Sequence, residues 1–152
     1  MGYAVGGGCW VVGGGSPVLR APNAVRPWQH VLDCLNGYLI LVDALIEGEA
    51  TGAWNFGPNG EDYHTVGEVA NQAEVTWGEP LKWRHQPSEG FHESEILLLN
   101  SEKATSELGW KRKLNFQESI EWSIRWYRNV FDGAHPHDEV LRDIHMFEEL
   151  MR

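Results

Sequence analysis

The segment from Arg20 to His30 (RAPNAVRPWQH) carries the side chains best suited to bind an anion. It places two arginines and a histidine on a loop interrupted by prolines, directly before a run with helical periodicity. A guanidinium group donates two parallel hydrogen bonds, which suits the oxygens of a diphosphate. The N-terminus of the following helix would add a favourable dipole. Residue types alone leave two interpretations open: a diphosphate site, or an Arg26 that pairs with a surface acid.

The histidines are weaker candidates for chemistry. His135, His137 and His145 lie near Asp138 in the sequence, but this spacing is not an established metal-ligand pattern on a helix. We therefore expect a solvated helix start there and no metal site. His92 falls in a loop between two expected strands, which is a common place for binding residues.

Two glycine triplets near the N-terminus suggest a phosphate-binding loop, because glycine lets backbone N–H groups approach a ligand. The spacing of Gly6, Gly8 and Gly13 does not satisfy G-x-G-x-x-G, and the sequence contains no G-x-x-x-x-G-K-[ST]. No tyrosine is followed four residues later by lysine, and G-x-S-x-G is absent. We therefore expect turns at the triplets, no catalytic residue and no bound cofactor.

Composition excludes several classes of function. The chain has 152 residues and a net charge of -10, from 12 basic and 22 acidic residues. Such a charge gives no electrostatic footprint for nucleic acid or an anionic membrane. The sequence has no long apolar run and no signal-peptide pattern, so the expected location is the cytoplasm. Cys9 and Cys34 are expected to be free thiols.

The elements that must position these residues follow from hydrophobic periodicity. The chain is expected to form one α/β to α+β domain over 1–152, with a glycine- and proline-rich strand–loop region (1–28) and a C-terminal amphipathic helix (136–152). Strands are predicted near 3–5, 18–20, 53–56, 81–85 and 96–99, and helices near 29–47, 66–76, 102–108, 116–131 and 138–151.

The helix predicted over 29–47 has a broad apolar face, because large apolar residues recur at steps of three and four. These residues are Val31, Leu35, Tyr38, Val42 and Leu45. The pattern predicts a central helix with this face in the core.

Three sequence signals mark helix starts. Thr65–Glu68 and Asn115–Glu118 each fit a capping box, in which the first side chain and the fourth cap each other's backbone N–H groups. Ser101 is predicted to cap the short helix that follows it.

The ordered string of these pieces resembles the C-terminal, substrate-binding half of the CDP-glucose 4,6-dehydratase family, within the extended short-chain dehydrogenase/reductase (SDR) superfamily. The similar residues are Gly6–Gly8 with Trp10, Pro17–Arg20, Asn23–Leu32 (NAVRPWQHVL), Trp54–Asn59 (WNFGPN), His92-Glu93, Ser101 with Lys103-Ala104, Leu108–Trp110 and Trp126-Tyr127. They cover nearly the whole chain in the order of the family. The resemblance implies a partial extended SDR fold of short strands and about five helices, without the Rossmann half.

The resemblance also implies roles for four residues. Arg26 matches an arginine that contacts the nucleotide diphosphate, and Arg20 matches an arginine beside the same pocket. Asn55 and the loop that carries His92 match positions around the nucleotide. Members of the family bind NAD in their Rossmann half and are dimers or tetramers. The resemblance therefore implies a homodimer here. It also makes a nucleotide sugar a candidate ligand.

The departures from the family are equally informative. The Rossmann half, with its glycine motif and catalytic Tyr and Lys, has no counterpart in these 152 residues. Tyr3 stands where the family has an asparagine that faces the sugar diphosphate, and Cys9 and Asn100 each stand where it has an aspartate. The loop and helix of the family between Trp10 and Pro17 are shortened.

Three hypotheses follow from this comparison. The first is a non-catalytic protein that self-associates and keeps a remnant of the sugar-nucleotide site. The second is a binding module for sugar nucleotides such as CDP-sugars. The third is the substrate half of a split dehydratase, with NAD supplied by a separate Rossmann partner. We rank self-association first and the binding module second.

Overall fold

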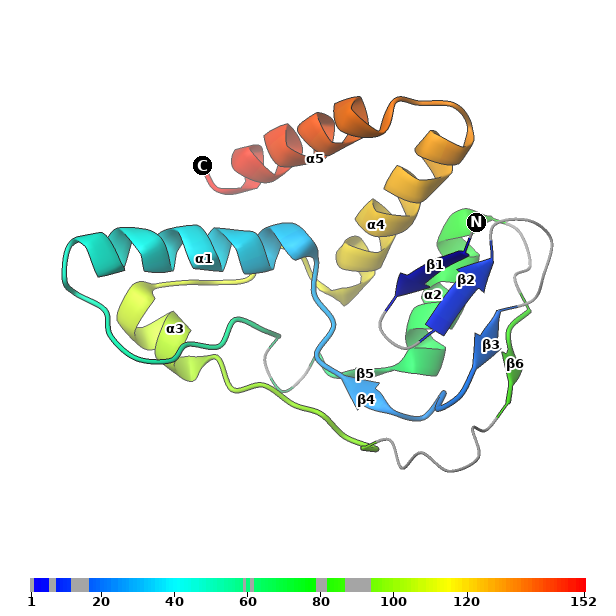
Figure 1. Ribbon diagram of the computed structural model, residues 1–152, viewed down its shortest axis with the longest axis horizontal. Coiled ribbons are helices and arrows are strands. Elements are labelled where there is room, and N and C mark those ends of the chain that lie inside the picture. Colours follow the sequence, from blue (N-terminus) through cyan, green and yellow to red (C-terminus); the bar gives the residue numbers. More distant parts are fainter. Residues whose placement is uncertain are drawn as a thin grey trace.

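The computed structural model describes residues 2–5, 8–11, 17–58, 60, 62–78, 82–86 and 94–152, with the backbone alone for 2–5 and 8–11. In this part of the chain the helices are α1 (Val31–Ile46), α2 (Val66–Trp77), α3 (Glu102–Leu108), α4 (Phe116–Phe131) and α5 (Pro136–Leu150). The strands gather at one end of the molecule and α1 extends away from them (Figure 1). The α2 helix packs against α4, α4 against α5, and α1 against α3.

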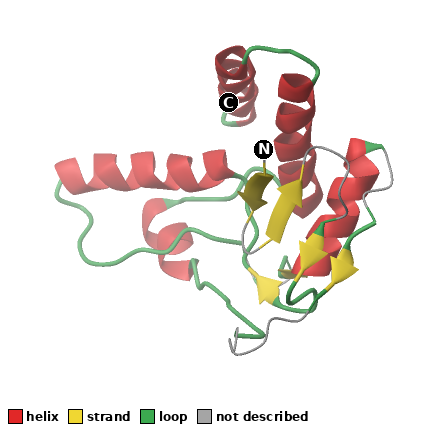
Figure 2. Cartoon of the chain, turned by 45° about the vertical axis from the view of Figure 1, so that its right-hand side comes forward, coloured by secondary structure: helices red, strands yellow, loops and turns green. Residues whose placement is uncertain are grey.

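The described strands form two small sheets (Figure 2). The first has the order β1 (Gly2–Val5), β2 (Gly8–Val11), β3 (Val18–Leu19), β6 (Arg84–His85), and the second pairs β4 (Val25–Arg26) with β5 (His64–Thr65). The pairs β1/β2, β2/β3 and β4/β5 are antiparallel, and β3/β6 is parallel. None of the described helices is long and apolar enough to cross a membrane.

All five predicted helices are confirmed, with ends within two residues of the expected ones. Both predicted capping boxes are present. Thr65 Oγ1 accepts from the N–H of Glu68 at 3.1 Å, and the Glu68 carboxylate accepts from the N–H of Thr65 at 2.7 Å. Asn115 and Glu118 make the same exchange at the start of α4.

Ser101 is the N-cap residue of α3, as predicted, but its side chain makes no capping hydrogen bond. Its hydroxyl accepts from the N–H of Gly57 at 2.8 Å and donates to the Gly57 carbonyl at 3.1 Å, so it joins two loops. The Asn100 side chain takes the capping role, because its Oδ1 accepts from the N–H of Glu102 at 2.8 Å.

The strand predictions are less accurate. The strand predicted over 3–5 is confirmed as β1. The strands predicted over 18–20 and 81–85 are present but shorter, as β3 and β6, and Leu81 lies outside the described residues. The predicted strand 53–56 is wrong: the Phe56 carbonyl accepts from the Gln29 amide at 2.7 Å rather than from a neighbouring strand. The predicted strand 96–99 reduces to one bridge between Ile96 and Val25. Strands β2, β4 and β5 were not predicted, because segments of two to four residues are too short to show a period.

The core consists of two clusters of buried side chains. One joins Phe56, Ala104 and Trp110, and the other joins Leu114, Trp122 and Phe147. The first cluster depends on Gly37, because a Cβ at this position would lie 2.4 Å from the Phe56 ring.

A buried carboxylate connects the two clusters. Asp33, in the first turn of α1, is 0% exposed and accepts from the backbone N–H groups of Lys113 at 2.7 Å and Leu114 at 3.2 Å. Its main-chain carbonyl accepts from the Trp110 indole at 3.2 Å. Burial raises the pKa of this carboxyl, and the two N–H donors act in the opposite direction.

Replacement of this carboxylate tests its structural role. We expect Asp33→Ala to lower the free energy of unfolding by about 2–4 kcal/mol, because it leaves two N–H groups of the α3–α4 connection without an acceptor. Urea denaturation followed by tryptophan fluorescence measures the change. Asp43→Ala, an exposed position on the same helix, is the matched control and should change stability by less than about 0.5 kcal/mol. Equal effects of the two variants would contradict this role.

Candidate functional site

Two of the predicted site residues, Arg26 and Asn55, lie along one extended segment, residues 95–100. On one side, the N–H of Val25 donates to the Glu95 carbonyl at 2.8 Å and the N–H of Leu97 donates to the Val25 carbonyl at 3.1 Å. These bonds place Arg26, the next residue of β4, beside this segment. Its guanidinium donates to the Val25 carbonyl at 2.7 Å.

Asn55 contacts the far end of the same segment. Its side-chain amide donates to the Asn100 carbonyl at 3.4 Å. Arg26 and Asn55 thus lie beside the two ends of one segment, which hydrogen bonds hold on both sides.

Arg20 does not join this arrangement. Arg20 is exposed at the end of β3, in the other sheet, and its carbonyl lies 3.1 Å from His85 Nε2 of β6. His92 lies outside the described residues. Of the four predicted site residues, the structure therefore places Arg26 and Asn55 on the same segment.

A hollow of about 720 Å³ lies beside Asn100. Its polar lining includes Tyr63, Asn100, Ser101 and Thr105. The Tyr63 hydroxyl donates to the Leu99 carbonyl at 2.7 Å, which fixes the ring on the wall of the hollow. Tyr63 cannot be recognised as a site residue from sequence, because an isolated tyrosine before a capping box has no distinguishing pattern. Hydroxyl and amide groups of this kind can orient a polar ligand, but they supply no activated nucleophile.

A second hollow, of about 290 Å³, lies between the start of α1 and helices α4 and α5, and it is lined by His30, Trp126, Tyr127 and Asp143 among others. His30 is the buried N-cap of α1, and its Nδ1 accepts from the N–H of Leu32 at 3.3 Å. Its ring packs edge-on against Trp122, with the centroids 5.7 Å apart.

Burial is the main influence on the His30 imidazole and lowers its pKa. Asp143 acts in the opposite direction, while Arg125 lowers the pKa further. The Arg125 guanidinium donates to the Asp143 carboxylate at 2.7 Å. His30 is therefore a neutral hydrogen-bond acceptor held in a partly desolvated place.

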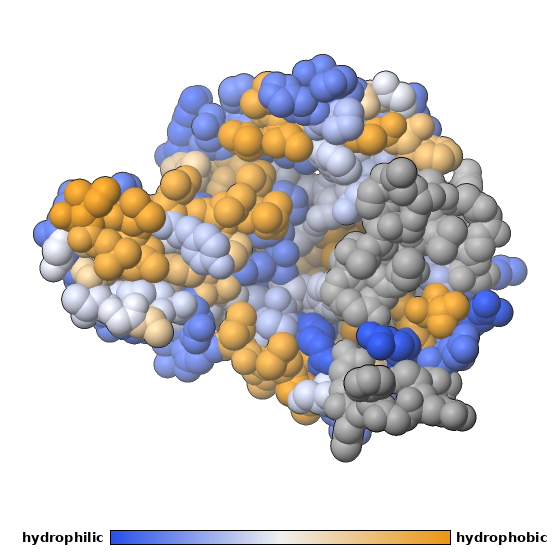
Figure 3. All heavy atoms as spheres, in the orientation of Figure 1, coloured by the Kyte–Doolittle hydropathy of each residue, from blue (hydrophilic) through white to orange (hydrophobic). Residues whose placement is uncertain are grey.

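The side of α1 that faces solvent is a surface of large apolar side chains. The prediction that its apolar residues at steps of three and four lie in the core is wrong, because these side chains are about half exposed or more. Apolar side chains gather on the surface over α1, at the left of Figure 3. The outer face of α1 consists of Val31, Leu35, Tyr38, Leu39, Val42, Leu45 and Ile46, with Leu39 67% and Ile46 79% exposed. The inner side of the helix carries the small or polar residues Asp33, Gly37 and Ala44. An apolar helix face of this width normally packs against a core or a partner.

Comparison with known proteins relates this fold to enzymes of nucleotide-sugar metabolism. No protein-family model matches the chain. CDP-glucose 4,6-dehydratase of Salmonella typhimurium is 32% identical over 118 residues, which cover 76% of this chain and 33% of that protein. UDP-glucose 4-epimerase of Halalkalibacterium halodurans is 27% identical over 116 residues.

The chain is a relative of the nucleotide-sugar dehydratases and epimerases. Its fold agrees with this relation. A UDP-glucose 4-epimerase from Stenotrophomonas maltophila, solved with NAD and formylated UDP-arabinopyranose, matches with a TM-score of 0.65 at 22% identity over 74% of this chain. A dTDP-glucose 4,6-dehydratase from Bacillus anthracis, solved with NAD, matches with a TM-score of 0.60 at 23% identity over 75% of this chain.

The match is partial, as the sequence resemblance implies. The chain spans about a third of the length of these relatives and corresponds to part of the C-terminal half. Its helices and short strands are those of a partial extended SDR fold, so the expected fold class is confirmed.

The buried His30 predicts a pH dependence of folding. A lowered pKa in the folded state means that the unfolded chain binds protons more tightly, so stability rises with pH through this range. We expect full stability above the ordinary pKa of 6.5, and a loss as the pH falls from 6.5 through the lowered folded value.

Thermal unfolding of wild type and His30→Asn between pH 5 and 8 tests this expectation. Asparagine keeps an N-cap acceptor and does not titrate between pH 5 and 8. The variant should therefore lose the part of the slope of stability against pH that His30 contributes. The exposed His137→Asn is the matched control and should keep the wild-type profile. An unchanged slope in His30→Asn would show that His30 does not cause the pH dependence.

Proposed function

We propose that this chain is a non-catalytic protein that self-associates through the outer face of α1. The observation that carries the proposal is the apolar character of that face, with seven large side chains exposed on one helix. A contiguous apolar surface of this kind on a protein typically marks an interaction site.

The size of the face suits an interface. Seven side chains that are about half to four-fifths exposed present on the order of 700 Å² of apolar surface, close to the roughly 800 Å² that each partner contributes to a standard interface. A second copy is the simplest occupant, because a two-fold axis lets one surface cover itself.

The spacing and the charges favour an antiparallel pair of α1 helices. Val31, Leu35, Tyr38, Val42 and Leu45 follow the alternating steps of three and four residues of a coiled-coil seam. The C-terminal end of the helix carries Asp43, Glu47 and Glu49. A parallel pair would place these acids against their own copies, whereas an antiparallel pair places them beside the positive end of the opposite helix dipole. Leu35 of one copy would then lie opposite Val42 of the second.

Several features support the absence of catalysis by this polypeptide alone. Its sequence has no dinucleotide fingerprint and no Tyr-x-x-x-Lys. The hollow beside Asn100 offers hydrogen-bonding groups but no activated nucleophile. We therefore propose that these 152 residues bind no NAD and dehydrate no sugar on their own.

Charge on the outer face of α1 should separate the copies. Sedimentation velocity at micromolar concentration should show a wild-type dimer and a monomeric Leu39→Lys/Val42→Lys variant, with a dissociation constant raised at least 100-fold. The reason is that each large apolar side chain contributes about 1.5–3 kcal/mol when buried, and the lysine at position 42 would be buried against Leu35 of the second copy.

Val75→Lys is the matched control, because Val75 is 74% exposed on α2, away from the face. This variant should sediment like wild type. A monomeric wild type would contradict self-association and would favour a separate Rossmann partner as the occupant of the face. Equal dissociation by the control would show that the interface does not use α1.

A remnant sugar-nucleotide site is the second candidate function. The observation that favours it is the placement of Arg26 and Asn55 along the segment 95–100, whose last residue, Asn100, lines a hollow. The relatives solved with NAD and a UDP-sugar show which class of ligand to test. The two functions are compatible, because the site residues and the outer face of α1 are on different elements.

Calorimetry with CDP, UDP and CDP-glucose tests this site. We expect binding of CDP-glucose that Arg26→Lys weakens at least tenfold, since lysine cannot donate the two parallel bonds of a guanidinium. Arg84→Lys, an exposed arginine of β6, is the matched control and should bind like wild type. A folded protein that gives no heat at millimolar ligand would show that the site no longer binds nucleotides.

A further inference from the structure

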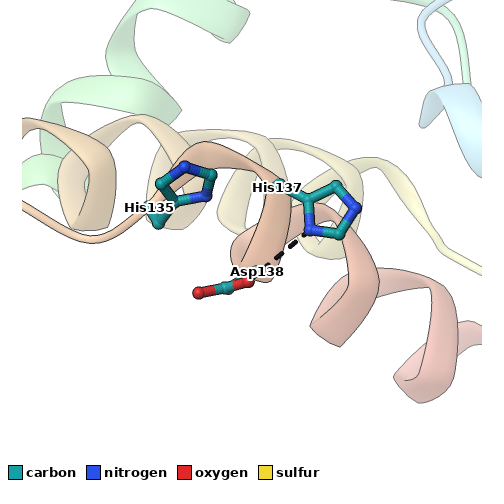
Figure 4. Close-up of side chains that lie close together, drawn as sticks. All are labelled: His135, His137 and Asp138. Atoms are coloured by element: carbon teal, nitrogen blue, oxygen red, sulfur yellow. Dashed lines mark ion pairs between the residues drawn. The ribbon is translucent and has the colours of Figure 1, made fainter.

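The start of α5 carries three side chains whose metal-binding atoms lie close together. The ligand atoms of His135, His137 and Asp138 are all within 4.8 Å of one another. In Figure 4 the two imidazole rings flank the first turn of the helix and the Asp138 carboxylate lies below them. The sequence analysis considered His145 with this group, but in the structure His145 pairs with Glu148 further along α5 at 3.5 Å.

The fold does not use these side chains for its own stability. His135 is the N-cap residue of α5, yet its side chain makes no capping hydrogen bond. The His137 and Asp138 side chains are 69% and 76% exposed, and the contact between them is a pair at 3.6 Å. All three are therefore accessible to a ligand from solvent.

The backbone that carries them is well defined. Pro136 stands at the first position of the helix, where its fixed φ suits the helical conformation. Before it, the N–H of Ala134 donates to the Asn129 carbonyl at 2.8 Å and closes the turn after α4. Because the backbone is held on both sides, binding of a metal ion would need to order only the torsions of the three side chains.

The donor set indicates the class of metal. Two imidazoles and one carboxylate suit Zn²⁺ and similar borderline ions better than Ca²⁺ or Mg²⁺, which prefer oxygen ligands. Tetrahedral zinc with ligands at about 2.0–2.1 Å needs donor atoms roughly 3.3 Å apart, so the exposed side chains must close by at most about 1.5 Å. Three protein ligands leave one position for water.

The local charges permit a cation. The partial positive charge of a helix N-terminus opposes one, but Asp138 and Glu139 in the first turn offset it. Glu139 is held by Arg142 at 2.6 Å and by Asn129 at 2.8 Å, so Asp138 is the carboxylate that can turn toward a metal.

From this geometry we propose that His135, His137 and Asp138 form a surface site for one Zn²⁺ ion. The site is independent of the outer face of α1 and of the nucleotide remnant, since it depends on residues at the opposite end of the chain from both. It assigns a binding role to side chains that neither proposed function uses.

Titration of tag-free protein with zinc sulfate tests the site, with isothermal calorimetry as the readout and the histidine ring signals in NMR as a second. We expect one zinc ion per chain. His137→Ala should weaken its binding at least tenfold, and addition of zinc should shift the ring signals of His135 and His137.

His145→Ala is the matched control, because it removes an exposed histidine of the same helix outside the cluster. This variant should bind zinc like wild type. The proposal is overturned if wild type shows no binding at 100 μM zinc, or if His137→Ala binds as tightly as wild type. If His145→Ala loses zinc binding while His137→Ala keeps it, other residues bind the zinc and the proposal is likewise overturned.

Discussion

The hydrogen bonds of the Asp33 carboxylate determine how α1 sits on the rest of the molecule. Two backbone N–H groups of the α3–α4 connection point at this carboxylate, and the Trp110 indole binds the main-chain carbonyl of the same residue. Because a buried carboxylate without partners is costly, the side of α1 that carries Asp33 has to face inward. Gly37, one turn further on, follows it against the Phe56 ring.

This orientation explains the exposed apolar surface. With Asp33 and Gly37 facing inward, helical geometry places the large residues of the heptad pattern on the opposite side. The outer face of α1 is thus a consequence of one polar contact rather than a failure of packing. The same apolar pattern that predicts a core helix from sequence therefore produces an interaction surface in the structure.

The outer face of α1 differs from the sequence-based prediction for a simple physical reason. Its sequence is suited to burial, yet its seven large side chains stay exposed among the described residues, with the Tyr38 ring meeting Phe56 edge-on. The relatives are more than twice as long as this chain. An element selected to pack inside a longer protein keeps its local pattern, and this pattern alone does not show whether the neighbour is present.

Local sequence is enough to predict the helices, both capping boxes and the relation to nucleotide-sugar enzymes. These depend on short-range periodicity, on contacts three residues apart and on specific strings such as WNFGPN. Four other features appear only in the folded chain: the pairing of the short strands, the side of α1 that is buried, the link between Ser101 and Gly57, and the separation of Arg20 from Arg26 and Asn55. Each of these depends on hydrogen bonds between residues far apart in the chain, and such contacts have no signature in local spacing.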